Sequence, residues 1–401
     1  MAVSFLNREV SDLCLGKPAL KPIPAGATLS EALTALKKSG KTHVSVWSCD
    51  HSRKVLEEDS ACICIGKICM VDVILFLSKE ENLVNPSKAL QTPVSFILPE
   101  GNSIVRHLDP NSSLLEAIDY VLEGAQNLVI PIQNYKSTPS RKKLLSKASY
   151  LSPTSYHNGV EYCWLTQEDI VRFLLNSIGV FSPMPTFSIE SLNIINHDMM
   201  TVSYHDPAIS SLDDIARAYI EQSSVAVVDE ENRLIGEISP FTLAYCDETV
   251  AAAIATLSAG DLMTYIDYGG PPEDLIELIK TRLQDKKLGA MVELLDEEFS
   301  LSSSSSCSAS SCSSDDELGS SKATVLGRYS SARRSEAITC YPWSSLVAVM
   351  FQALAHRANS IWVMDEDHNM IGVVTFQGIL EVFRSIANVR RKPERENTSK
   401  Q

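Results

Sequence analysis

The chain has 401 residues, of which 44% are hydrophobic and 21% are charged, and its formal net charge is −15 at pH 7. This composition is typical of a globular protein, and the length is enough for two or three domains with their own cores. The excess of acidic residues argues against a nucleic-acid partner, because binding to nucleic acid depends mainly on Lys and Arg.

The N-terminal residues and the most apolar run indicate the expected cellular compartment. The first residues, MAVSFLNREV, reach charged side chains before an apolar core can build, so we expect no secretory signal. The most apolar run, ICMVDVILFL, is too short to cross a bilayer and contains Asp72, so we expect no membrane span. We therefore expect a cytoplasmic or nuclear protein with reduced cysteines.

The predicted elements follow one order four times along the chain: an amphipathic helix, a strand, and a second strand that leads into a closing helix. These units are predicted at 28–78, 112–178, 210–245 and 344–386. The clearest evidence is the match between Val227–Ser239 and Val363–Thr375, each of which has the pattern of a hairpin around a polar turn. A short strand ending near a proline is expected before each first helix. The unit is therefore strand–helix–strand–strand–helix, and the fold class is α/β (α+β).

Three cysteines of the first unit, Cys62, Cys64 and Cys69, lie in a predicted strand. Their spacing alternates in the way that small hydrophobic residues do in a strand. A zinc site would need a second cluster elsewhere, and the scattered histidines supply none. We favour buried reduced thiols and predict no metal site.

Two segments do not fit the repeated order. The segment 134–161 is rich in Ser, Pro and basic residues, and we interpret its Arg141–Lys143 run as charge on a solvated loop. The segment 297–335 contains a Ser-rich stretch with too little apolar surface to fold, so we expect a disordered loop there.

The Ser-rich segment also carries a candidate modification site. Ser313 and Ser314 are followed at the third position by Asp316 and Glu317, which is the acidic context that casein-type kinases prefer. We expect either phosphorylation at these serines, which adds negative charge to an exposed loop, or an unmodified spacer.

The repeated unit resembles the cystathionine-beta-synthase (CBS) domain, whose tandem pairs form Bateman modules. Four such repeats without an attached enzyme are similar to the gamma subunit of AMP-activated protein kinase, and the layout resembles the plant four-CBS proteins of the CBSX type. The resemblance implies four CBS repeats in two Bateman modules. The repeat boundaries that we predict are 1–88, 89–182, 183–260 and 261–390, with a tail at 391–401.

The resemblance also implies where a ligand would bind. In the CBS family, the turn from strand to helix carries Gly–x–x–Thr/Ser–x–x–Asp, and the hydroxyl and the acid hold the ribose of an adenosine-type ligand. The second repeat keeps Thr166 and Asp169, while the first keeps Asp72 but has Cys69 in the hydroxyl position. The third and fourth repeats lack the acid. Thr166 and Asp169 also match a helix-capping box, and the two roles are compatible.

A phosphate clamp known from the kinase gamma subunit, a His-Arg pair before the second strand, is missing. The matching positions hold Thr42–His43, Gln126–Asn127, Ser223–Ser224 and Asn359–Ser360. His356–Arg357 comes three residues too early, and we expect it on the surface of the preceding helix. The expectation for a cofactor is therefore open: no ligand, or a weakly charged adenosine compound among the adenine nucleotides and S-adenosylmethionine.

No catalytic motif stands out, and His107 and Asp109 fit a turn before a helix. We expect a non-catalytic regulatory protein that senses an adenosine-containing ligand in its first CBS pair. By resemblance, its partner would be a kinase complex, and a homodimer through the CBS modules is a further option. The alternative is a ligand-independent scaffold built from the four repeats.

Overall fold

The computed structural model describes residues 2–49, 62–98, 104–132, 160–267, 272–304 and 336–389. Ser313, Ser314, the Arg141–Lys143 run and the tail 391–401 lie outside the described residues. Among the described residues, no helix is both long and apolar enough to cross a membrane.

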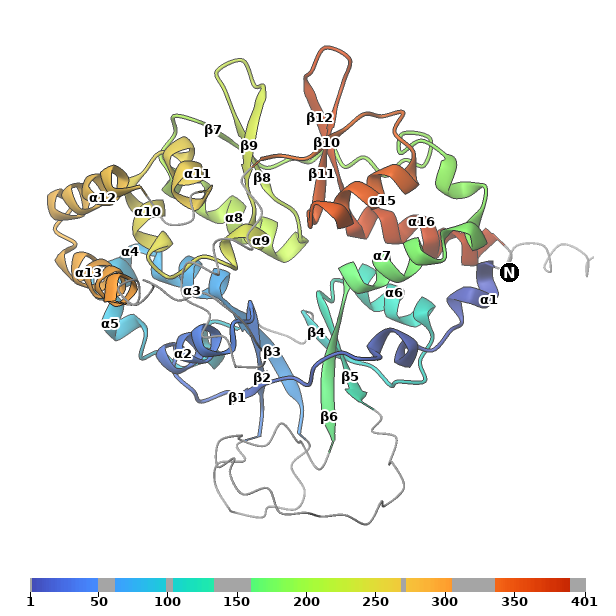
Figure 1. Ribbon diagram of the computed structural model, residues 1–401, viewed down its shortest axis with the longest axis horizontal. Coiled ribbons are helices and arrows are strands. Elements are labelled where there is room, and N and C mark those ends of the chain that lie inside the picture. Colours follow the sequence, from blue (N-terminus) through green and yellow to red (C-terminus); the bar gives the residue numbers. More distant parts are fainter. Residues whose placement is uncertain are drawn as a thin grey trace, which may run out of the picture.

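Each of the four repeats forms a three-stranded sheet (Figure 1). A short first strand runs parallel to the middle strand, and the third strand runs antiparallel to it. In order, the strands are β1 (Pro22–Pro24), β2 (His43–Trp47), β3 (Cys64–Cys69); β4 (Val105–His107), β5 (Asn127–Ile132), β6 (Glu161–Thr166); β7 (Thr201–Ser203), β8 (Val225–Val228), β9 (Leu234–Ile238); and β10 (Thr339–Cys340), β11 (Ser360–Met364), β12 (Met370–Thr375). The middle strands are almost wholly buried, which agrees with their β-branched and aromatic residues.

Two helices accompany each sheet, one before the middle strand and one after the third strand. They are α2 (Leu29–Ser39) and α3 (Met70–Leu77), α6 (Leu114–Leu122) and α7 (Gln167–Asn176), α8 (Leu212–Glu221) and α9 (Pro240–Leu243), and α15 (Leu346–Ala355) and α16 (Phe376–Val389). Thr28, Ser113 and Ser345 begin three of these helices, because each side chain accepts a hydrogen bond from a first-turn backbone N–H.

The remaining described helical segments lie before β1, between repeats or, in the case of η5, between β7 and α8 of the third repeat. They are α1 (Ala2–Leu6), η1 (Val10–Cys14), α4 (Glu80–Leu83), α5 (Pro86–Ala89), η2 (Val94–Phe96), η3 (Ile178–Phe181), η4 (Met184–Thr186), η5 (Ala208–Ser211), α10 (Val250–Thr256), α11 (Ala259–Asp267), α12 (Glu273–Asp285) and α13 (Gly289–Ser304).

The sheets associate in two pairs, as predicted for two Bateman modules. Trp47 of the first sheet packs with Val129 and Trp164 of the second sheet. Val228 of the third sheet packs with Trp362 of the fourth. We call the first and second repeats the first pair, and the third and fourth repeats the second pair. The hairpins of the two pairs point in opposite directions (Figure 1).

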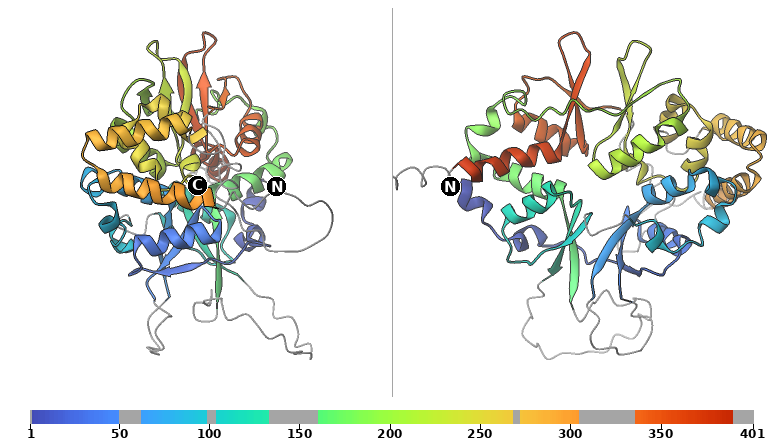
Figure 2. Two further views of the ribbon diagram at one scale, coloured as in Figure 1. Left: turned by 60° about the vertical axis from the view of Figure 1, so that its left-hand side comes forward. Right: turned by 180° about the vertical axis from the view of Figure 1, so that it is seen from behind.

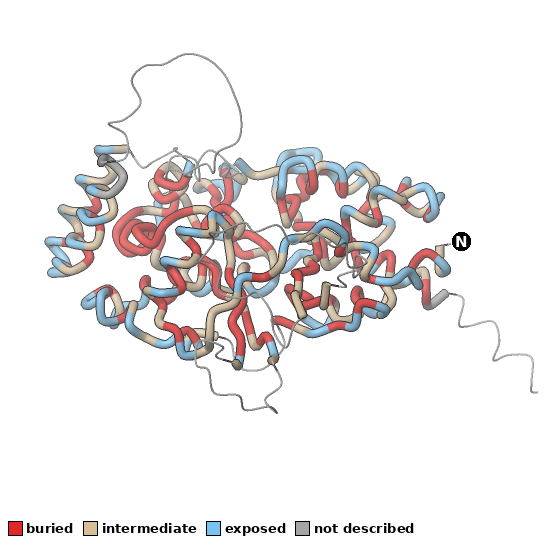
Figure 3. The backbone as a smooth tube through the Cα atoms, turned by 60° about the horizontal axis from the view of Figure 1, so that its bottom comes forward, coloured by how far each residue is buried: buried red, intermediate tan, exposed pale blue. Residues whose placement is uncertain are grey.

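The helices join the two pairs across the molecule. Buried residues of the first and third repeats form one apolar core, and those of the second and fourth repeats form another. Two lobes of helices therefore flank the strands, as the view from behind shows (Figure 2). Buried backbone is concentrated inside these lobes, and the exposed residues follow their outer turns (Figure 3).

The helices α11–α13 pack with the first and third repeats. α12, α13 and most of α11 lie within 261–390, the range predicted for the fourth repeat, and Leu262, Leu283 and Leu295 are buried in the core of the first and third repeats. Their amphipathic pattern predicts a buried face and does not name the surface that buries it.

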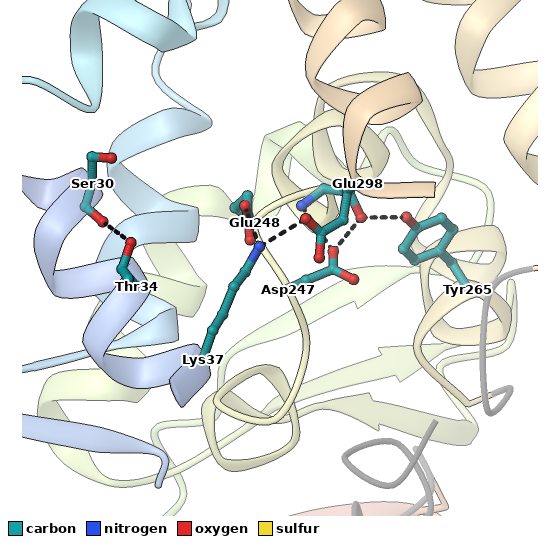
Figure 4. A network of polar contacts seen from close by, with 8 residues as sticks. Ser30, Thr34, Lys37, Asp247, Glu248, Tyr265 and Glu298 are labelled. Atoms are coloured by element: carbon teal, nitrogen blue, oxygen red, sulfur yellow. Dashed lines mark hydrogen bonds and ion pairs between the residues drawn. The ribbon is translucent and has the colours of Figure 1, made fainter. Parts of the chain in front are cut away.

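One polar network ties these extra helices to the first pair. Lys37 Nζ at the end of α2 lies 2.7 Å from Glu248 Oε1 and 2.8 Å from Glu298 Oε2 on α13 (Figure 4). Thr249 beside them donates its backbone N–H to Asp247 and lies 2.8 Å from the Tyr265 hydroxyl. Burial raises the pKa of the Glu248 carboxyl to about 7.

Candidate functional site

The strand-to-helix turns occupy equivalent positions in the four repeats. Gly66, Gly236 and Gly372 pair with Val46, Val227 and Val363 of the adjoining middle strands, and Cys163 pairs in the same way with Ile130. The sequence alignment of the turns therefore matches the register of the sheets. Cys69, Thr166, Ser239 and Thr375 follow at the hydroxyl position.

Thr166 and Asp169 cap α7 as the sequence predicted. Asp169 Oδ2 accepts hydrogen bonds from the Thr166 backbone N–H at 2.8 Å and from the Thr166 hydroxyl at 2.7 Å. Thr166 Oγ1 in turn accepts from the Asp169 backbone N–H at 3.2 Å. Asp169 Oδ2 also lies 2.6 Å from Lys17 Nζ, and a quarter of the Asp169 side chain is exposed. The cap therefore leaves the carboxylate facing a cavity.

That cavity, which we call the first-pair cleft, has a volume of about 360 Å³. Trp164 and Leu20 supply apolar walls, and Thr42 and Ser45 supply hydroxyl groups. Lys17, Lys21 and Lys41 line it as well.

The lysines give the first-pair cleft a positive potential. Burial and the nearby charge of Lys21 lower the pKa of Lys41. Burial, with the nearby charges of Lys67, Lys41 and Lys17, lowers the pKa of His43 to about 3, so its imidazole is neutral. The expectation of a weakly charged ligand depended on the missing His-Arg pair, but the structure supplies cations from the linker before β1 and from the end of α2.

The corresponding turn of the first repeat is already occupied by a side chain of the third repeat. Tyr219 on α8 donates its hydroxyl to Asp72 Oδ2 at 3.1 Å, and the Cys69 thiol donates to the Tyr219 oxygen at 3.2 Å. The Asp72 carboxylate also accepts from the Cys69 backbone N–H at 2.7 Å. Burial raises the pKa of Asp72, of Cys69 and of Tyr219. A ribose at this turn would have to displace the tyrosine.

The sequence contained no signal for Tyr219. It lies on an amphipathic helix, as many buried or surface tyrosines do, and its partners are more than a hundred residues away in the chain. Lys67 Nζ lies 5.6 Å from the centre of its ring, in a cation–π contact.

The turns of the second pair are filled by the protein itself. A Cβ atom added to Gly372 would lie 2.4 Å from Ile195 and 2.9 Å from the Asn196 carbonyl oxygen. The Asn196 backbone forms a two-way bridge with Val373. The indole of Trp362 is fully buried and donates to Glu237 Oε2 at 2.7 Å. Protein atoms therefore pack closely against Gly372 and Trp362.

A larger cavity of about 430 Å³ lies where all four repeats meet. His43, Asn127, Tyr219 and Arg357 reach it from the four repeats in turn. The sequence placed Arg357 on the surface of a helix. Arg357 is exposed, as expected, but it does not lie on the helix, because α15 ends at Ala355; with a φ of +52°, Arg357 lines the central cavity.

Several other sequence candidates have structural roles. His107 Nε2 accepts from the Cys64 backbone N–H at 2.9 Å and its ring contacts Trp47 and Tyr162. Cys64 and Cys69 are buried thiols, and Cys62 is partly buried. Within the described part of the chain, no group of three or more His, Cys, Asp or Glu side chains is placed to hold a metal ion.

Comparisons with known proteins place this architecture among relatives. No family model matches the chain. The chain is 46% identical to the CBS domain-containing protein CBSX5 of Arabidopsis thaliana, over 96% of this chain and 98% of that protein. It is 22% identical to the SNF1-related protein kinase regulatory subunit gamma-like PV42b of the same plant, over 95% and 96% of the two chains. A Methanocaldococcus jannaschii structure, proposed as an archaeal homologue of γ-AMPK, matches with a TM-score of 0.52 and 16% identity, over 94% of this chain and 99% of that one.

Proposed function

The chain belongs to the plant CBSX group of CBS-domain-containing proteins, and on that premise we propose that it is a regulatory protein that binds an adenine nucleotide in its first-pair cleft. The observation that carries the proposal is the first-pair cleft itself. It joins a carboxylate and a hydroxyl at the strand-to-helix turn to three lysines and an aromatic wall.

Each part of a nucleotide has a chemical counterpart in the cleft. Asp169 accepts hydrogen bonds from the two ribose hydroxyls, since a carboxylate forms strong bonds with such donors. Trp164 and Leu20 contact the base. Lys17, Lys21 and Lys41 bind the phosphates, and Lys17 then exchanges its ion pair with Asp169 for one with the ligand. Three lysines favour an anionic nucleotide over the cationic S-adenosylmethionine.

The proposed partner is a protein kinase complex. The likeness in sequence to a kinase regulatory subunit gamma-like protein, along the whole chain, supports this partner class. Ligand binding between the first and second repeats would act on the partner through the helices that both pairs share.

A second candidate function is a ligand-independent scaffold. It is favoured by the filling of the other turns, by Tyr219 in the first repeat and by Ile195 and Trp362 in the second pair. A protein that closed these sites could use the same fold only to present a surface.

Isothermal titration of the purified full chain with AMP, ADP, ATP and S-adenosylmethionine separates the two functions. We expect saturable binding of at least one adenine nucleotide and none of S-adenosylmethionine. Absence of nucleotide binding at about millimolar concentration would leave the scaffold function standing.

The same titration on variants locates the site. Asp169→Ala should weaken binding roughly ten- to a hundredfold, because the ribose loses its charged acceptor. Glu31→Ala is the matched control, since Glu31 completes the capping box of α2 but does not line the first-pair cleft. Lys41→Gln should weaken AMP binding more than adenosine binding, whereas Lys38→Gln, at an exposed position near the end of α2, should change neither.

A further inference from the structure

Two cysteine thiols lie together beside the first-pair cleft. Cys14 ends η1, and Cys163 stands in the middle of β6, against which η1 packs. Both thiols are buried in the core of the second and fourth repeats, and each contributes to the pKa shift of the other. Both are free in this structure.

The fold itself brings these two positions together. Cys163 occupies the strand position that holds Gly66 in the first repeat and Gly372 in the fourth. A Cβ atom on Gly66 would lie 2.6 Å from Leu98, and one on Gly372 would lie 2.4 Å from Ile195. Leu98 belongs to the linker before the second repeat, and Ile195 belongs to the linker before the third repeat. In each pair, the linker before one repeat therefore contacts the glycine of the other repeat. In the second repeat a cysteine faces that linker, and the linker carries Cys14.

Both chain segments continue from the thiols into the first-pair cleft. Lys17 follows Cys14 on the linker, and Thr166 follows Cys163 at the end of β6. Lys17 pairs with Asp169 at 2.6 Å, and the Leu20 backbone N–H donates to the Tyr162 carbonyl oxygen at 2.8 Å. A covalent bond between the thiols would fix the linker to β6 on the cleft side of the second repeat.

The surroundings also divide the roles of the two thiols. The neighbouring Cys14 thiol and the charge of Lys17 lower the pKa of Cys163, whereas the neighbouring Cys163 thiol and burial raise the pKa of Cys14. Cys163 is therefore the more nucleophilic sulfur, because the thiolate is the reactive form. By contrast, burial raises the pKa of the Cys340 thiol in the same core to about 12.

We propose that Cys14 and Cys163 form a reversible disulfide on exposure to a hydroperoxide, and that this disulfide restricts ligand entry to the first-pair cleft. The second half of the proposal rests on the proposed function. A disulfide with this effect makes ligand binding responsive to oxidants.

The chemistry balances with hydrogen peroxide as the oxidant. The Cys163 thiolate attacks one peroxide oxygen, the O–O bond breaks, and the sulfur becomes a sulfenic acid while hydroxide leaves as water. The Cys14 sulfur then attacks the Cys163 sulfur, the S–O bond breaks, and a second water leaves with the Cys14 proton. The two thiols lose two electrons and two protons in total, and a dithiol reductant restores them.

Peptide mapping tests the disulfide without any nucleotide. The reduced full chain is treated with hydrogen peroxide, the remaining thiols are alkylated, and unreduced peptides are analysed by mass spectrometry. We expect a peptide pair linked through Cys14 and Cys163 that disappears with dithiothreitol. Cys340→Ser should keep this product, while Cys14→Ser and Cys163→Ser should each remove it. If peroxide oxidises the partly exposed Cys49 and Cys62 while Cys14 and Cys163 stay reduced and are alkylated, the proposal is overturned.

Titration with AMP tests the regulatory half. The oxidised wild type should bind AMP about tenfold more weakly than the reduced protein, because the fixed linker lowers the population of the open cleft. Dithiothreitol should restore the affinity, and Cys14→Ser should bind equally before and after peroxide. A linked protein with unchanged affinity would remove the regulatory role. A reduced protein that binds no nucleotide would overturn the proposed function and the regulatory role together, while the mapped disulfide would stand.

Discussion

The first and second pairs share their strand order and register but differ in what fills the space beside the strand-to-helix turn. In the first pair, Asp169 faces a cleft lined by Lys17 and Trp164. In the second pair, Trp362 and the Asn196 backbone fill the equivalent region. The same fold therefore provides a binding site in one pair and a packed core in the other. Side-chain volume at a few positions makes the difference.

The largest effect is expected from emptying the packed core of the second pair. Trp362→Ala should lower the free energy of unfolding by about 3–5 kcal/mol, because removing the fully buried indole leaves a cavity and breaks its hydrogen bond to Glu237. Trp164→Ala in the first-pair cleft should cost less, about 2 kcal/mol, since water can enter the vacated space. Urea unfolding measures both. Equal losses would contradict the contrast between the two pairs.

A second prediction concerns the contact between the first pair and the helices that follow the third repeat. Burial raises the pKa of Glu248 from 4.5 to about 7. Between these values the folded state holds a proton that the unfolded chain releases, so stability falls as pH rises from 4.5 to 7. The loss is on the order of 3 kcal/mol.

Glu248→Gln should flatten this pH dependence, because the amide keeps the shape of the neutral acid and stays uncharged. Urea unfolding from about pH 5 to about pH 8 measures it. Glu297→Gln, at an exposed position on α13, is the control and should retain the wild-type slope. A Glu248→Gln variant with an unchanged slope would contradict the assignment of this pH dependence to Glu248.

A third prediction tests the tyrosine that closes the turn of the first repeat. Tyr219→Phe should lower the free energy of unfolding by about 2 kcal/mol, because Asp72 loses a hydrogen-bond donor and Cys69 loses an acceptor. Thermal unfolding detects it. Tyr204→Phe, from the same repeat, serves as a comparison, and an equal effect there would argue that the Asp72 contact contributes little.

The smallest effect is expected at the helix cap of the open site. Asp169→Asn should cost about 1 kcal/mol of stability, because the amide accepts the capping hydrogen bonds less strongly than the carboxylate. Glu31→Gln in the capping box of α2 should cost a similar amount. A much larger loss at Asp169 would indicate that its ion pair with Lys17 also stabilises the linker.

The fold was largely predictable because the order of helices and strands in each repeat depends on residues that are close together in the chain. The helix starts at Thr28, Ser113 and Ser345 follow capping chemistry that operates over three or four residues. The hairpin predicted at Val227–Ser239 is confirmed by the antiparallel pair β8 and β9, in which Gly236 pairs with Val227. Such signals involve neighbours in the chain, so a sequence contains them directly.

The site was predictable only in part. Thr166 and Asp169 could be identified because they cap their own helix. Lys17, Lys21 and Lys41 could not, since the linker and the end of α2 reach the first-pair cleft only after the two sheets pair. The same holds for Tyr219, whose partners lie in another repeat. The sequence expectation of a weakly charged ligand therefore took no account of these lysines.

The sequence by itself determined four repeats, their strand and helix order and the acid in two of the four turns. Tertiary structure alone decided which turn is open, which positive charges face it and where α11–α13 pack. The physical reason lies in the range of the forces. Backbone hydrogen bonding and hydrophobic periodicity act within one element, whereas the occupation of a cavity depends on which distant side chains the packed helices bring to it.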